Sequence, residues 1–171
     1  MGDDQSTRVS LPRWTAPIIW LVGIGFVHGV IPWGISLIAY QHGWTEGRAG
    51  RWNLLGVIPL VAGIAGLTWI LLVHLGSASE KVELELTPKY LLVRGPYRFS
   101  RNPMYVAELA LWLGWAIFFG SIAVLLGLLI LWATMNFIVV PREEHTLEGQ
   151  FGESYRRYKN TVARWLSTPQ R

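Results

Sequence analysis

Cysteine is absent from this chain of 171 residues. Its absence excludes a disulfide framework, a thiolate metal site and a cysteine nucleophile. Charged residues are also scarce, at 15% of the sequence, against about 25% in an average soluble domain. Hydrophobic residues reach 51%, and 10 residues are tryptophan. This composition excludes a disordered chain, a collagen-like chain and an ordinary soluble enzyme, and it favours a membrane protein.

Four apolar stretches organise the chain. In chain order they are residues 16–40, 54–75, 105–119 and 122–140. The first two are long enough, as helices, to cross a hydrocarbon core of roughly 30 Å. The third is shorter and contains Glu108, and Gly120 and Ser121 separate it from the fourth. We predict a tight turn at this pair and a helical hairpin around it, because a helix satisfies its own backbone groups in lipid.

Basic residues are distributed unevenly between the connections. With four spans, the N-terminal tail, the second connection and the C-terminal segment share one side, and they hold all but two of the 15 Lys and Arg residues. Basic loops stay in the cytoplasm. We therefore predict an all-α, multi-pass inner-membrane protein with about four transmembrane helices and both termini cytoplasmic. It forms a single membrane domain, residues 1–171, with a two-span part (1–83) followed by a hairpin part (84–171).

Small residues recur at four-residue spacing in the first two spans. Gly25 and Gly29 form one such pair, and Ala62 and Gly66 form the other. Pairs of this kind let helix backbones approach closely in lipid. We predict that they mediate packing between spans.

The segment after the fourth span is predicted to form cytoplasmic amphipathic helices. Pro141 is typical of the first turn of a helix, and Glu143 and Glu144 would lie near the positive end of that helix. Gly152 is expected to end it, and residues 153–165 to form a surface helix. Its side chains expected at lipid head groups are Arg156, Arg157 and Lys159, and those expected at the interface are Tyr155, Tyr158 and Trp165.

Two polar segments, 84–105 and 141–165, flank the same hairpin on its cytoplasmic side. They must therefore meet at its mouth. The side chains expected there are Tyr97, Arg98, Arg101, Asn102, Tyr105, Glu143 and Glu144. A charged pocket beside an apolar bundle suits a polar cofactor from the cytosol and a lipid-soluble substrate. The alternative is a set of ordinary juxtamembrane basic residues neutralised by nearby acids.

The order of residues in these segments is more informative about function than their charge. The motifs are Gly95-Pro96-Tyr97, Arg101-Asn102-Pro103-Met104-Tyr105, and Glu143-Glu144 followed by Leu147, Phe151-Gly152, Tyr155 and Tyr158. Over residues 87–165 the chain resembles the isoprenylcysteine carboxyl methyltransferase family and the related phospholipid methyltransferases. The resemblance implies a cofactor, S-adenosylmethionine, held between the loop before the hairpin and the acidic segment after it. The implied cofactor contacts are Lys89, Leu91, Leu92, Tyr97, Asn102, Pro103, Met104, Tyr105 and Glu143.

The implied reaction is methyl transfer to a lipophilic acceptor that carries a carboxylate, an amine or a thiol. Arg101 and Arg142 are candidates for orienting a substrate carboxylate or phosphate. Glu108 is a third catalytic candidate, because an unpaired acid within a membrane helix is costly. Pairing of Glu108 with a loop arginine is the alternative. No residue is an obvious base for an ammonium acceptor.

Two isolated histidines, His28 and His74, lie within the spans. Without a third ligand they are a weak metal signal, and we expect hydrogen bonds and no metal. Asn136 is expected to bond across helices.

Two other functions remain open. One is an NADPH-dependent membrane reductase of the sterol-reductase type, and the other is a non-catalytic lipid-binding membrane protein. A Rossmann sheet is excluded, because Gly23-Ile24-Gly25 lies in a predicted span with no strand before it. The expected partners are membrane lipids and a lipophilic substrate, without nucleic acid, and the oligomeric state is left open.

Overall fold

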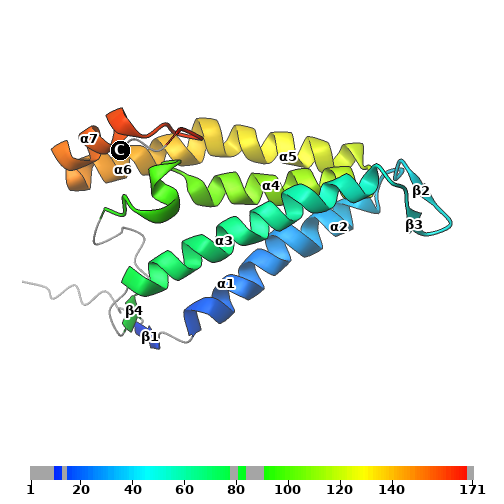
Figure 1. Cartoon of the computed structure of the whole chain (residues 1–171), viewed down its shortest axis with the longest axis horizontal. Coiled ribbons are helices and arrows are strands. Elements are labelled where there is room, and N and C mark those ends of the chain that lie inside the picture. The colour runs from blue at the N-terminus through cyan, green and yellow to red at the C-terminus, as the bar shows by residue number, and fades with distance from the viewer. Residues whose placement is uncertain (1–9, 13–14, 78–80, 84–90, 169–171) are drawn as a thin grey trace, which may run out of the picture.

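The computed structural model describes residues 10–12, 15–77, 81–83 and 91–168. Within them the fold is mostly helical, with two short strand pairs (Figure 1). The helices are α1 (Thr15–Gly25), α2 (Ile31–Ser36), α3 (Val57–Ser77), α4 (Pro103–Phe119), α5 (Ile122–Thr134), α6 (Val140–Phe151) and α7 (Glu153–Thr161). Short helical turns of other kinds are η1 (Phe26–Val30), η2 (Asn53–Gly56), η3 (Gly95–Arg98) and η4 (Met135–Val139). The antiparallel strand pairs are β1 (Ser10–Pro12) with β4 (Lys81–Glu83), and β2 (Trp44–Thr45) with β3 (Arg48–Ala49).

Two π-helical turns, η1 and η4, interrupt two of the helices without ending them. Each π-turn stops two residues before a proline, Pro32 in the first case and Pro141 in the second. A proline ring clashes with the carbonyl one turn earlier in a regular α-helix. A wider turn relieves that clash, so the helix continues through the proline.

The continuous helix from α5 through η4 to α6 corrects one prediction. Pro141 does lie in the first turn of α6, but Val139, the residue that caps α6, is itself helical, with φ −71° and ψ −58°. Helical backbone therefore precedes Glu143, and the predicted free, positive helix end beside it is wrong. Gly152 ends α6 as predicted, with φ +52°.

Helices α3 and α4 pack most closely, and glycines make this possible. A Cβ added at Gly56 would lie 2.5 Å from Gly114 O, and one added at Gly63 would lie 2.7 Å from the Leu111 side chain. One added at Gly66 would lie 3.1 Å from the Cβ of Ala107, so the second predicted small pair contributes one contact residue.

The first predicted small pair does not mediate packing. A Cβ at Gly25 or Gly29 would meet no described atom within 4 Å. The prediction that these glycines pack against another span is therefore wrong, because residue spacing does not reveal which face of a helix meets a neighbour.

The predicted turn between α4 and α5 is confirmed. Gly120 adopts φ +56°, a left-handed conformation that glycine tolerates, and Ser121 Oγ accepts a hydrogen bond from Val124 N at 3.4 Å. The loop after α2 meets this turn, since His42 N donates to Gly120 O at 3.0 Å. The first and third connections therefore lie at the same end of the bundle.

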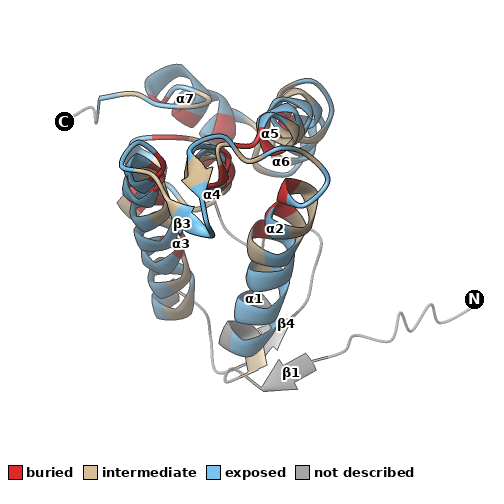
Figure 2. Cartoon of the chain, turned by 90° about the vertical axis from the view of Figure 1, so that its right-hand side faces the viewer, coloured by how far each residue is buried: buried red, intermediate tan, exposed pale blue. Residues whose placement is uncertain are grey.

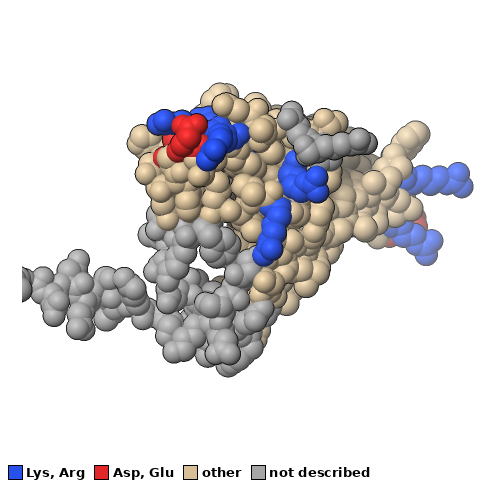
Figure 3. Space-filling view, turned by 60° about the vertical axis from the view of Figure 1, so that its left-hand side comes forward, with Lys and Arg blue, Asp and Glu red and all other residues tan. Residues whose placement is uncertain are grey.

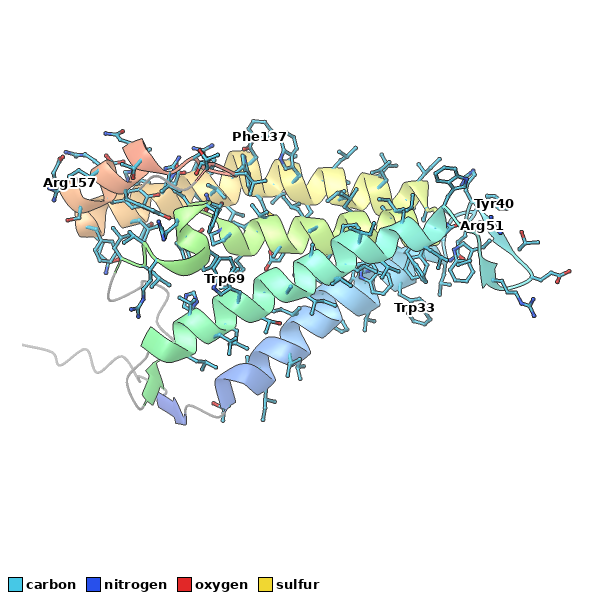
Figure 4. All side chains as sticks on the ribbon, viewed as in Figure 1. Trp33, Tyr40, Arg51, Trp69, Phe137 and Arg157 are labelled. Atoms are coloured by element: carbon cyan, nitrogen blue, oxygen red, sulfur yellow. The ribbon has the colours of Figure 1, made fainter. Side chains whose placement is uncertain are left out.

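Apolar side chains cover the outer surface of the helices. Two helices, Asn53–Gly76 and Ile122–Phe151, are long and apolar enough to cross a membrane, and few of their residues are buried. Leu21–Ser36 and Pro103–Phe119 are shorter apolar helices. Figure 2 shows buried residues on the inward faces and exposed ones outside, and Phe137 points outward in Figure 4. Such a surface suits lipid better than water.

On the face drawn in Figure 3, acidic and basic side chains cluster at one corner, further basic side chains lie nearer the middle, and charged side chains appear again at the far end. Helix α7 and the end of α6 lie at one end, and the β2–β3 turn lies at the other (Figure 1). The charged motifs before and after the hairpin thus occupy the α7 end.

Candidate active site

A hydrogen bond joins the two segments that flank the hairpin. The hydroxyl of Tyr105, in the first turn of α4, donates to Glu143 Oε2, in the first turn of α6, at 3.0 Å. The carboxylate of Glu143 remains exposed. This contact confirms that the motif before the hairpin and the acidic motif after it meet at one end of the bundle.

Behind this contact lies a buried ionic cluster centred on Glu144, whose residue exposure is only 5%. Arg164 donates two hydrogen bonds to this carboxylate in a bidentate contact, through Nε at 3.1 Å and Nη2 at 2.9 Å. Arg101 adds a second cation, with Nη1 3.0 Å from Glu144 Oε1. Two guanidinium groups therefore share one buried carboxylate.

Arg101 is not fully satisfied by this arrangement. Its side chain is 9% exposed, and its Nε and Nη1 have no hydrogen-bond acceptor in the part of the chain that the structure describes. Nη1 is close to Glu144, but the contact is an ion pair without hydrogen-bond alignment. Buried donors are normally paired, so Arg101 retains capacity for a further anionic partner.

A C-terminal strap, residues 162–168, ties this cluster to the loop before α4. Ala163 O accepts from Arg101 N at 3.0 Å, and Ser167 N donates to Phe99 O at 2.8 Å. The side-chain amide of Asn102 donates to Arg164 O at 3.0 Å. The surface helix was predicted to reach residue 165, but α7 ends at Thr161 and the strap follows it.

The tyrosines of α7 face inward, which corrects their predicted interfacial position. Tyr155 and Tyr158 form a buried cluster with Val162. The hydroxyl of Tyr158 donates to Tyr97 O at 2.7 Å, and burial raises the pKa of Tyr158 well above its usual value. Their partners are Leu91, Tyr97, Leu147 and Phe151.

The basic residues of α7 differ in their contacts. Arg156 Nε lies 3.0 Å and Lys159 Nζ 3.4 Å from the Glu148 carboxylate. These two partners hold the pKa of Glu148 below its usual value. Arg157 is exposed at the outer end of α7 (Figure 4).

The remaining predicted site residues are scattered around this end. Leu92 is half-buried in the extended segment before η3, Pro103 is buried at the start of α4, and Arg142 is exposed on α6. Met104 packs against the core cluster of Leu67 and its neighbours. Lys89 lies outside the described residues.

Glu108 lies one helical turn after Tyr105 and faces the first helical segment. Its Oε1 is 3.6 Å from His28 Nε2. The neighbour of this carboxylate is therefore a histidine from the first helical segment, and not the loop arginine offered as an alternative above. The indole of Trp112 donates to His28 Nδ1 at 3.1 Å, and that of Trp115 donates to His28 O at 2.6 Å. Sequence reasoning missed this network because its members are far apart in the chain.

His74 and Asn136 have other partners. His74 Nδ1 lies 2.9 Å from Ile70 O, and its ring meets Tyr97 edge-on. Asn136 Oδ1 accepts from Trp165 Nε1 at 3.1 Å, so it binds the strap rather than a neighbouring helix. The two histidines thus take part in separate contacts.

Similarity to known proteins identifies the class to which this chain belongs. Residues 54–154 match the phospholipid methyltransferase family, and the chain belongs to that family. An uncharacterized protein of Haemophilus influenzae is 41% identical over 63 residues, which are all of that protein and 37% of this chain. The family match begins earlier than the resemblance in sequence, since it includes α3, and it contains both Tyr105 and Glu143. Neither His28 nor the C-terminal strap falls within it.

Proposed function

We propose that the chain is an S-adenosylmethionine-dependent methyltransferase that acts on a lipophilic acceptor within the membrane. The hydrogen bond between Tyr105 and Glu143 carries this proposal, because it joins the two motifs that the family resemblance assigns to the cofactor. Methyltransferase family membership supports the reaction class. The outward apolar surface supports an acceptor that reaches the site from lipid.

The side chains at this end fit the chemistry of that cofactor. Glu143 offers an exposed carboxylate for an ammonium group or for hydroxyl groups. Arg101 has two buried N–H donors without acceptors among the described residues, which suits a carboxylate. The rings of Tyr97 and Tyr105 are suited to contact an aromatic base or a cation. When bound, the cofactor supplies an electrophilic methyl group on a sulfonium, and the protein contributes binding, orientation and exclusion of water.

The same proposal places four helical segments across the membrane as one domain, with both termini in the cytoplasm. The contact between His42 and Gly120 supports it, because it brings the first and third connections to the end opposite α7. Reporter fusions at Gly47 and Ser121 test it. Both are expected to report the non-cytoplasmic side, and opposite sides for the two would overturn the topology.

Binding of S-adenosylhomocysteine, measured by calorimetry in detergent, tests the activity. We expect Glu143→Ala to weaken binding, whereas Glu153→Ala, an equivalent change on the exposed start of α7, is expected to leave it unchanged. Heat of binding from a nicotinamide nucleotide instead would support the reductase. No heat from either ligand would contradict both enzymes, and unchanged binding in Glu143→Ala would refute the site.

A further inference from the structure

His28 lies in a polar contact that is unusual for the interior of an apolar bundle. It sits in the π-turn η1 and is buried. Pro32, four residues later, has no N–H to offer the His28 carbonyl, and that carbonyl accepts instead from Trp115 Nε1 at 2.6 Å. The π-turn and the proline thus fix where this histidine sits. π-Turns of this kind are frequent at functional sites.

The hydrogen bond from Trp112 determines the tautomer of His28. An indole N–H is only a donor, so His28 Nδ1 must accept from it. In the neutral ring the proton therefore resides on Nε2, the nitrogen that lies 3.6 Å from Glu108 Oε1. The indole itself is held in place, because a Cβ at Gly127 on α5 would come within 2.7 Å of its ring. His28 consequently turns its Nε2–H toward the carboxylate of Glu108, at a distance longer than a hydrogen bond.

Glu108 is also close to the candidate cofactor site. It lies one turn from Tyr105 on the same helix face, and the hydroxyl of Tyr105 in turn donates to Glu143 Oε2 at 3.0 Å. Its side chain is 12% exposed, so it is not sealed off. The ionisable groups facing it are His28 from η1, Tyr105 from α4 and Glu143 from α6, since α5 has none and α3 has only His74, which contacts Tyr97.

We propose that Glu108 accepts the proton that the methyl acceptor loses, and that His28 is the residue that positions Glu108 for this role. This inference rests on the proposed function. The lone pair of the acceptor atom forms a bond to the methyl carbon while the carbon–sulfur bond breaks and sulfur keeps that electron pair. The acceptor's proton passes to a carboxylate oxygen of Glu108. No further reactant is required.

Two consequences follow for the enzyme. The attacking atom carries a proton before reaction, as in an amine, a hydroxyl or a thiol, because a carboxylate acceptor would need no base. The first helical segment, which lies outside the family match, also contributes a working part of the site. Trp112 contributes indirectly, because its hydrogen bond fixes the tautomer of His28.

The test compares Glu108→Gln, His28→Leu and His28→Gln with the unchanged protein. Methyl transfer from radiolabelled S-adenosylmethionine to aminophospholipid vesicles is measured across pH, and S-adenosylhomocysteine affinity is measured by calorimetry. At neutral pH we expect Glu108→Gln to lose about 100-fold or more in rate, with the loss shrinking as alkaline pH removes the acceptor's proton. His28→Leu is expected to be slower by about tenfold or more. His28→Gln should recover much of this loss, since its amide also carries an N–H donor that can face Glu108. The affinity for S-adenosylhomocysteine should remain within about twofold of the parent value in all three variants.

If Glu108 and His28 only stabilise the fold, the variants give a different pattern of rates and affinities. In that case the rate falls equally at every pH, and S-adenosylhomocysteine affinity falls with it, which would overturn the inference. Trp112→Phe, which keeps an aromatic ring and removes the donor, provides a milder variant should the others fail to fold. A pH profile unchanged from that of the parent protein would also overturn the inference. Absence of S-adenosylhomocysteine binding by the parent protein would instead refute the proposed function.

Discussion

Replacing Gly114 with alanine should separate α3 from α4 and destabilise the protein. The added Cβ would lie 2.8 Å from Gly56 O, 2.8 Å from Leu60 N and 2.6 Å from Leu60 Cγ. Two of these three atoms belong to backbone, which cannot rotate away, so the helices must move apart by about 0.6 Å to reach an ordinary contact. Overpacking of this kind costs about 1–3 kcal/mol, and we expect the upper part of that range, about 2–3 kcal/mol.

Gly25→Ala is the matched control, because a Cβ there meets no described atom within 4 Å. An exposed helical glycine gains about 0.5–1 kcal/mol on replacement by alanine, so the two changes should have opposite signs. Thermal unfolding in detergent, followed by near-UV circular dichroism, measures both. At about 2–4 °C per kcal/mol, Gly114→Ala should lower Tm by about 4–12 °C. Equal shifts in the two variants would refute the packing described for α3 and α4.

Three smaller changes test the α7 end. Tyr158→Phe removes the donor to Tyr97 O and should cost about 1–2 kcal/mol, seen as a lower Tm, whereas an unchanged Tm would argue against the buried bond. Arg164→Lys cannot reproduce the two-pronged contact with Glu144, so we expect a loss of about 1–2 kcal/mol in the same assay, and full stability would contradict this. The pKa of Glu148 is lowered by its two basic partners, so its carboxylate stabilises α7 above the unfolded value of 4.5 and loses this effect as pH falls below it. Hydrogen exchange of α7 should therefore accelerate in acid in the parent protein but much less in Glu148→Gln.

Local chemistry in the sequence was sufficient to predict several parts of the fold. The turn at Gly120 and Ser121 depends on a left-handed glycine and a side-chain cap, both of which are properties of two adjacent residues. The end of α6 at Gly152 has the same origin. The meeting of Tyr105 with Glu143 followed from the hairpin alone, because two segments that flank one hairpin must lie at its open end.

Features that depend on distant neighbours could not be predicted in this way. Pro141 was interpreted as a helix start, whereas the π-turn before it lets the helix continue. Tyr155 resembles an interfacial residue on α7, yet it is buried in a cluster against which Leu91 and Tyr97 pack. The pairing of His28 with Trp112 joins residues 84 positions apart. No local pattern encodes such a contact, although Pro32 after His28 marks a freed carbonyl.

A double-mutant cycle at Tyr105 and Glu143 tests most directly whether the two remote segments jointly hold the cofactor. S-adenosylhomocysteine affinity is measured by calorimetry for Tyr105→Phe, for Glu143→Ala and for the double variant. The Tyr105 hydroxyl acts through Glu143 in this structure, so we expect each single change to weaken binding and the double variant to be no weaker than Glu143→Ala. The coupling should be about 0.5–3 kcal/mol. Strictly additive losses, or no loss in either single variant, would contradict a shared cofactor site.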